Sequence, residues 1–125
     1  MNIENFNDLL QAARAQPVPQ RLLFVFAGAE LPEDASPEQR ADFEAGQGGA
    51  LVPLMCVDKA PEELHSFETL VQEARQFGQT WTLVFAAATE GQADKPLQAM
   101  VEAIKRGEIG AYIPFDVRGE TVHLG

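Results

Sequence analysis

The sequence is poor in the side chains that most often carry covalent and metal chemistry. Its 125 residues include one cysteine, Cys56, and two histidines, His65 and His123, which lie far apart. One cysteine excludes an internal disulfide, and neither histidine has a cysteine or carboxylate at the spacing of a zinc site. Both serines lack the flanking glycines of a hydrolase nucleophile. We therefore expect no metal ion, no cofactor and no serine nucleophile.

Basic side chains are scarce as well. Nineteen acidic residues stand against nine basic ones, and the formal net charge is -10. This charge repels nucleic-acid backbones and anionic lipid headgroups, so neither a nucleic acid nor a membrane is an expected partner. The longest apolar runs fall far below the roughly 20 residues that cross a bilayer, and the first residues lack the pattern of a secretory signal. We expect a cytoplasmic protein.

The remaining composition is that of a globular protein. Hydrophobic residues make up 46% of the chain and charged residues 22%, which is far from the profile of a disordered chain. The length suits one domain whose core needs neither disulfides nor metal. We expect residues 1 to 125 to fold as a single domain.

Helix and strand patterns alternate along the chain. Apolar residues at helical spacing begin at Phe6, and the prolines of "QPVPQ" end that pattern. Residues 21 to 29, "RLLFVFAGA", are apolar throughout and predict a central strand buried on both faces. Ser36 and Gln39 have the spacing of a capping box for a short helix over residues 37 to 45.

A second strand is expected over residues 50 to 57, after the glycine-rich "GQGG". These glycines follow a helix and precede a strand, the reverse of a phosphate-binding loop, so we interpret Gly46 as a helix C-cap. Pro53 lacks the N–H that a sheet ladder needs, which favours an edge position or a bulge. This strand is therefore not expected at the centre of the sheet.

The second half of the chain continues the alternation. One apolar face at helical spacing predicts a long helix over residues 61 to 77. Residues 80 to 88 predict another buried strand, and a last helix begins near Pro96. "IGAYIPF" and "TVHLG" flank "DVRGE" and predict a closing C-terminal β-hairpin.

Strands that alternate with helices are usually parallel and joined by right-handed crossovers. We therefore predict an α/β fold: a single domain with a mixed, mostly parallel sheet of about five strands, flanked by helices and closed by the hairpin. Residues 21 to 28, 51 to 57 and 80 to 87 should be parallel neighbours or near neighbours. The helix over residues 61 to 77 should pack on them.

Cys56, Asp58 and Lys59 form the first candidate ligand-binding site. They lie at the C-terminal end of the second strand and just before a helix start, where parallel sheets bind ligands. A lysine and a helix N-terminus favour ionisation of a thiol, although Asp58 opposes it and no second cysteine is present. The alternative is a small core residue, since free cysteine is among the most buried residue types. We expect this alternative, with Cys56 buried and slow to react.

Two surfaces are candidates for partner binding. In the closing hairpin, Tyr112 and His123 are expected to point away from the alternating apolar residues, although local packing is the simpler explanation for Tyr112. The acidic segment over residues 30 to 44 is long enough to be a binding loop, but its carboxylates lack the spacing of a cation site. Pro53 and the hairpin also suggest exposed sheet edges where another chain docks.

Residues 20 to 59, "QRLLFVFAGAELPEDASPEQRADFEAGQGGALVPLMCVDK", resemble a small bacterial protein family whose members are often labelled "ribonucleotide reductase subunit alpha". The resemblance extends over nearly the whole chain but implies no activity, cofactor or site residue. A reductase large subunit is a barrel several times longer, with a radical cysteine and a separate cysteine pair, whereas this chain has Cys56 alone. We therefore interpret the label as mistaken, or at most as a hint of association with such an enzyme.

Two functions from different classes follow. The first, which we expect, is a non-enzymatic binding or regulatory module for another protein or for a second copy of this chain. It is favoured because no nucleophile, base and orienting group converge in the sequence. The alternative is a small thiol-dependent or thiol-regulated enzyme that uses Cys56. The reactivity of the native thiol separates the two.

Overall fold

A four-stranded antiparallel sheet forms the centre of the protein. The structure, a computed structural model, describes residues 3–30, 34–44, 50–78 and 80–122. Its strands follow the order β2-β1-β3-β4, and each strand is antiparallel to its neighbours. They are β1 (Gln20–Glu30), β2 (Ala50–Lys59), β3 (Leu83–Glu90) and β4 (Ile113–Phe115). The predicted mostly parallel sheet of about five strands is therefore wrong.

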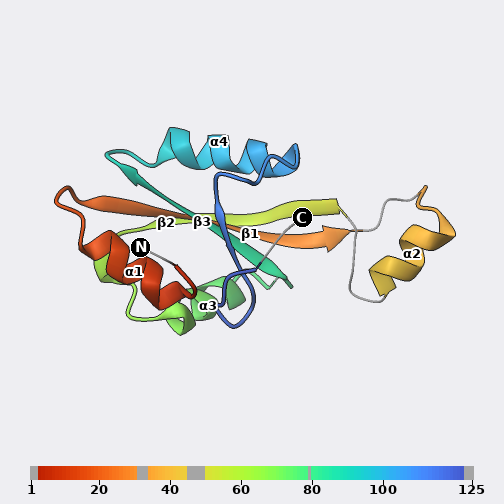
Figure 1. Cartoon of the computed structure of the whole chain (residues 1–125), viewed down its shortest axis with the longest axis horizontal. Helices are drawn as coiled ribbons and strands as arrows, with labels where there is room; N and C mark the ends of the chain where they lie inside the picture. Colours follow the sequence, from red (N-terminus) through yellow and green to blue (C-terminus); the bar gives the residue numbers. More distant parts are fainter. Residues whose placement is uncertain (1–2, 31–33, 45–49, 79, 123–125) are drawn as a thin grey trace.

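Helices cover both faces of this sheet (Figure 1). One face carries α1 (Phe6–Arg14), the 3-10 turn η1 (Pro61–Glu63) and α3 (Phe67–Arg75), and the other carries α4 (Asp94–Lys105). In contrast, α2 (Pro37–Glu44) stands beyond the ends of β1 and β2, at the right of the view. No helix in the described part of the chain is long and apolar enough to cross a bilayer.

The position of α2 explains why β1 and β2 are not parallel. A crossover helix needs an apolar face that packs on the sheet, but the α2 sequence PEQRADFE is mostly polar. The connection through α2 therefore joins two antiparallel neighbours, paired from Leu22 opposite Lys59 to Glu30 opposite Ala50. The connection through α3 does cross over, because β2 and β3 run in the same direction with β1 between them. Residues 46 to 49, where a C-cap is predicted, lie outside the described residues.

The central strand β1 is buried on both faces, as its sequence predicts. Leu22, Phe24 and Phe26 pack in the core with α1 and α3, whereas Leu23 and Val25 pack with α4. All five are at most 2% exposed. Burial on both faces accounts for the continuous apolar run in this strand.

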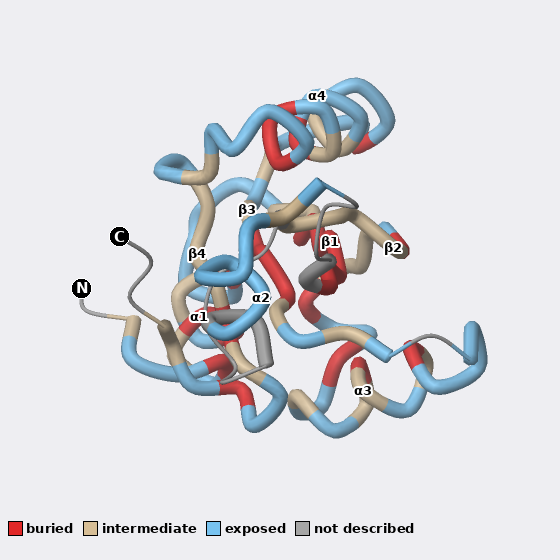
Figure 2. The backbone as a smooth tube through the Cα atoms, turned by 90° about the vertical axis from the view of Figure 1, so that its right-hand side faces the viewer, coloured by how far each residue is buried: buried red, intermediate tan, exposed pale blue. Residues whose placement is uncertain are grey.

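β2 forms one edge of the sheet, at the right of Figure 2, and no strand in the described part of the chain pairs with its outer side. Its register against β1 shifts between Phe26 and Ala27, where Leu54 is the extra residue of a bulge. Pro53 stands directly beside this bulge. The prediction that Pro53 marks an edge strand or a bulge is confirmed, and both features are present.

The opposite edge, at β4, is covered by two segments that are distant in the sequence. The Phe6 N–H donates to the Gly119 carbonyl over 2.8 Å, and the Thr121 N–H donates to the Glu4 carbonyl over 3.1 Å. Thr121 also forms an antiparallel bridge with the end of β4. The closing hairpin is therefore a short strand and an isolated bridge within the described residues, and residues 123–125, which include His123, lie outside them.

The sequence predicts one helix boundary correctly and another one wrongly. The capping box is confirmed, because Gln39 N–H donates to Ser36 Oγ over 3.1 Å and Ser36 N–H donates to Gln39 Oε1 over 2.8 Å. The helix predicted over residues 61 to 77 is instead η1 followed by α3. The break occurs at Leu64, whose backbone is extended and whose side chain is fully buried.

Candidate binding site at the β2 edge

A small apolar hollow lies between β2 and α3. Its volume is about 200 Å³, and its walls include Phe26 and Met55 from the sheet and Leu70 and Ala74 from the helix. Phe77, just past the end of α3, also lines the hollow and is 62% exposed. An exposed aromatic ring beside an apolar hollow is typical of a contact surface.

The local sequence explains how α3 shapes this hollow. Leu70 and Ala74 are four residues apart and therefore lie on the same side of the helix, where both are buried against the sheet. Gly78 has a φ of 71°, a left-handed conformation that ends helices. Phe77 thus falls beyond the last turn, outside the apolar stripe that predicted its burial, and its ring remains largely uncovered.

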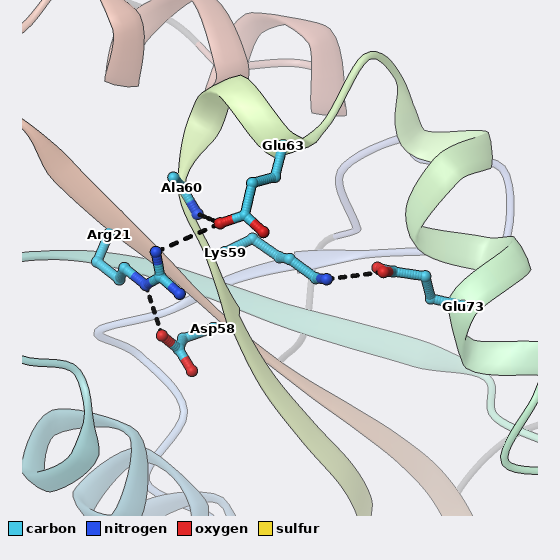
Figure 3. Close-up of polar contacts among 6 residues, drawn as sticks. All are labelled: Arg21, Asp58, Lys59, Ala60, Glu63 and Glu73. Atoms are coloured by element: carbon cyan, nitrogen blue, oxygen red, sulfur yellow. Dashed lines mark hydrogen bonds and ion pairs between the residues drawn. The ribbon is translucent and has the colours of Figure 1, made fainter.

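Two groups of ion pairs lie at the end of β2 beside the hollow (Figure 3). Lys59 Nζ is 2.7 Å from Glu73 Oε1, a contact that joins β2 to α3. Arg21 of β1 donates from Nε to Asp58 Oδ2 over 2.5 Å and from Nη1 to Glu63 Oε1 over 3.3 Å. The hydrogen bond to Asp58 raises the pKa of the Arg21 guanidinium above its ordinary value, so Arg21 stays charged throughout the pH range in which proteins fold.

The second carboxylate oxygen of Glu73 is an unused acceptor. Glu73 Oε2 is buried and accepts no hydrogen bond from any residue that the structure describes. A buried acceptor without a partner costs roughly 1–3 kcal/mol. Glu73 also lines the hollow, so its carboxylate is within reach of a ligand that binds there.

The structure brings the predicted ligand site together only in part, because Cys56 and Lys59 both border the hollow whereas Asp58 does not. Successive residues of a strand point to opposite faces, and Cys56 and Asp58 lie opposite Val25 and Leu23, on the α4 side. Lys59 lies on the α3 side, and Cys56 is exposed. The prediction of a buried Cys56 is wrong because β2 is an edge strand, which the apolar sequence around the cysteine does not reveal.

The predicted partner-binding residues are only partly described. Tyr112 is half-buried, and both Tyr112 and Ile109 pack against the apolar cluster under α4. This position agrees with the explanation that Tyr112 serves local packing. His123 lies outside the described residues. In the acidic segment over residues 30 to 44, residues 36–41 are exposed, and residues 31–33 lie outside the description. None of these features adjoins the hollow between β2 and α3 within the described residues.

A larger hollow of about 340 Å³ lies between α1 and β3 and is lined chiefly by alanines. Its polar side chains are Gln16 and Gln20, whose amides donate to the carbonyls of Ala12 and Val18. Among the described residues that line it, none is charged, so it lacks groups that orient a ligand. No group of three or more His, Cys, Asp or Glu side chains in the described ranges is arranged to hold a metal ion.

Sequence reasoning did not identify Glu73 and Phe77, the acidic residue and the exposed aromatic residue of the hollow at β2. The apolar face that predicts a helix over residues 61 to 77 includes Phe77 and treats Gly78 as its end, whereas α3 ends at Arg75 and leaves the Phe77 ring exposed. Glu73 lies on the same helix, and no sequence pattern links it to Lys59, fourteen residues away. Their contact depends on how α3 is placed over the sheet.

Comparison of the chain with protein-family models, with curated proteins and with solved structures finds no match. The family resemblance of residues 20 to 59 stays a prediction. The geometry of the β2 edge is thus the observation that bears on function.

Proposed function

We propose that this protein is a non-enzymatic binding module that holds an extended segment of a partner protein along the free edge of β2. In strand addition, main-chain hydrogen bonds provide affinity, and pockets for alternate side chains provide specificity. The observation that carries the proposal is the presence, at one edge, of a strand with a single neighbour and an apolar hollow beside it.

The second half of β2 is the suitable docking segment. Pro53 has no N–H, and the bulge at Leu54 interrupts the ladder in the first half. Over residues 55 to 59 the register against β1 is regular, and every second residue of an edge strand presents its N–H and C=O outward. Among the described residues, no backbone hydrogen bond joins this segment to an element other than β1. An added strand therefore fits beside residues 55 to 59.

The size of the hollow favours a peptide side chain over a metabolite. Small-molecule sites enclose about 300–1,000 Å³, whereas this hollow measures about 200 Å³. Its walls are mostly apolar, and the edge strand beside it supplies the main-chain groups that a peptide uses. A side chain of a bound strand matches both features.

The thiol-dependent enzyme remains the alternative, and the exposure of Cys56 favours it. Val101 and Lys105 of α4 line a second hollow together with Cys56. Lys105 lies 3.6 Å from Glu102, and Asp58 is bound by Arg21, so the nearby charges are engaged with other partners. This arrangement does not supply the base that an enzymatic thiol requires, and we therefore favour binding.

Cys56 provides a built-in reporter for the binding experiment. Peptides of about six residues, randomised at alternate positions, are selected on the immobilised full chain. The alkylation rate of Cys56 and the backbone amide shifts of β2 are then measured with and without each selected peptide. We expect slower alkylation and shifts over residues 55 to 59, with β4 unaffected.

The control is the same peptide methylated on alternate backbone nitrogens. Methylation removes the donors that strand addition uses but retains every side chain, so it should weaken binding by about tenfold or more. A library that yields no binder, or binders that leave Cys56 and the β2 amides unchanged, would contradict the proposal.

A further inference from the structure

We infer that the segment bound at β2 carries an apolar side chain and, two residues away on the same face, a lysine or arginine that pairs with Glu73. This inference rests on the proposed function and specifies the chemistry of the partner. It is based on the position of the apolar hollow, the unused oxygen of Glu73 and the charge around the end of β2.

The spacing follows from the geometry of β2. Met55, Val57 and Lys59 alternate onto the α3 side, and residues two apart in a strand are separated by about 6.6 Å. A strand added beside β2 presents its own alternate side chains over the same face at the same spacing. A side chain near Met55 or Val57 therefore meets the hollow and Phe77, and the next one, towards Lys59, meets Glu73.

The carboxylate oxygen of Glu73 that has no partner among the described residues favours a cation at that end of the hollow. Glu73 is the carboxylate that lines the hollow, and Lys59 is its cation, whereas the nearby Arg21 pairs with Asp58 and Glu63 and Arg14 donates to backbone carbonyls of Pro61 and Leu64. Lys59 occupies Oε1 of Glu73, while Oε2 accepts nothing from the described residues. The torsion that orients a carboxylate is broad, so the Glu73 carboxylate can turn to receive a donor from the hollow.

Partial burial strengthens this position relative to an ordinary surface pair. The side chains of Lys59 and Glu73 are 18% and 43% exposed, whereas those of Arg75 and Glu68 on the outer side of α3 are 70% and 60% exposed. Charges that are partly removed from water are screened less by salt and interact more strongly. A cation bound at Glu73 therefore contributes more to affinity than one bound at Glu68.

A second copy of this chain is a poor occupant of the same edge. The net charge of -10 opposes self-association. A two-fold symmetric contact through β2 brings the same surface of both copies together, and among the described residues at the end of β2 it supplies no additional cation for Glu73 beyond those already paired in each copy. A basic segment of another protein has the complementary charge.

The test compares two versions of a peptide selected at β2, one with lysine at the inferred position and one with glutamine there. Their affinities are measured by calorimetry for the unchanged protein, for Glu73→Gln and for the matched control Glu68→Gln. We expect the glutamine peptide to bind the unchanged protein and Glu68→Gln about threefold to tenfold more weakly than the lysine peptide. The two peptides should bind Glu73→Gln equally.

The apolar position is tested separately with Phe77→Ala. This variant should weaken both peptides by the same factor, because Phe77 contacts the hollow and not the cationic position. If Glu73→Gln does not fold, added salt replaces it, since salt should weaken the lysine peptide more than the glutamine peptide. Equal salt sensitivity would then overturn the inference.

The outcomes that would contradict this inference differ from those that would contradict the proposed function. Peptides that protect Cys56 but show no enrichment of lysine or arginine, or that discriminate equally on Glu73→Gln, would overturn this inference and leave strand addition in place. Peptides that leave Cys56 unprotected contradict the proposed function itself. Self-association that protects Cys56 without any peptide would identify a second copy as the occupant and would also overturn the inference.

Discussion

Lys59 of β2 and Glu73 of α3 are joined by an ion pair of 2.7 Å between Nζ and Oε1. The two residues belong to the strand and the helix that form opposite walls of the apolar hollow. The ion pair therefore fixes the distance between these walls at one end. It is also the point at which the stability of the fold and the proposed binding site depend on the same side chains.

Replacing Lys59 tests this contact. Lys59→Met keeps most of the side-chain volume but leaves both oxygens of Glu73 without their cation, and it should lower the free energy of unfolding by about 1 kcal/mol. The matched control is Lys105→Met, whose ion pair with Glu102 is longer, at 3.6 Å, and more exposed. That change should stay within about 0.5 kcal/mol. Urea denaturation of the three proteins gives the comparison, and equal losses would contradict it.

Two phenylalanines that differ in burial test the assignment of the core. Phe85 of β3 is fully buried under α4, whereas Phe77 is 62% exposed. Phe85→Ala should lower the unfolding free energy by about 3–5 kcal/mol, and Phe77→Ala should change it by no more than about 0.5 kcal/mol. Phe85→Leu gives a milder measurement if the alanine variant does not fold. A costly Phe77→Ala would show that its ring is covered in solution.

Three glycines separate backbone strain from steric overlap. A Cβ at Gly119 would lie 2.9 Å from Cγ of Phe67, and the φ of Gly119 is 82°. Gly78 also has a positive φ, of 71°, but open space around it, and Gly110 has open space without a positive φ. Alanine should therefore be nearly neutral at Gly110, cost about 1–2 kcal/mol at Gly78, and cost most at Gly119. Thermal unfolding of the three variants gives the order, and an inverted order would refute the turn geometry.

The exposed thiol gives the last prediction. Native Cys56 should react with a small alkylating reagent at nearly the rate of the denatured chain, because the residue is exposed at a sheet edge. Cys56→Ser should change the unfolding free energy by no more than about 0.5 kcal/mol. Slow labelling of the native protein, with normal labelling after denaturation, would show that the thiol is shielded from solvent and would contradict its exposure in this fold.

The sequence predicted the elements better than their directions. Three features follow from the properties of residues that are close together in the sequence. They are the apolar run of β1, the capping box at Ser36 and Gln39, and the edge position of Pro53. Strand direction depends instead on whether a connecting helix packs on the sheet. The polar sequence of α2 indicates that this helix does not pack on the sheet. The general rule that strands alternating with helices are parallel predicts the opposite, and here it fails.

The candidate site was less predictable because it is made by contacts between distant residues. Cys56 sits in an apolar sequence, and its exposure arises from the place of β2 in the sheet order. The pairing of Lys59 with Glu73 and the exposure of Phe77 depend on where α3 ends and how it lies over the sheet. Local patterns contain neither kind of information.

The hydrogen bonds between Glu4 and Thr121 also bear on how the protein is made. The main-chain N–H and the hydroxyl of Thr121 both donate to the Glu4 carbonyl, across a sequence separation of 117 residues. During synthesis, the segment around Glu4 leaves the ribosome long before its partner exists, and this edge of the sheet closes only after residue 121 has emerged. Until then α1 lacks its final neighbours, so the nascent chain exposes apolar surface that chaperones can bind.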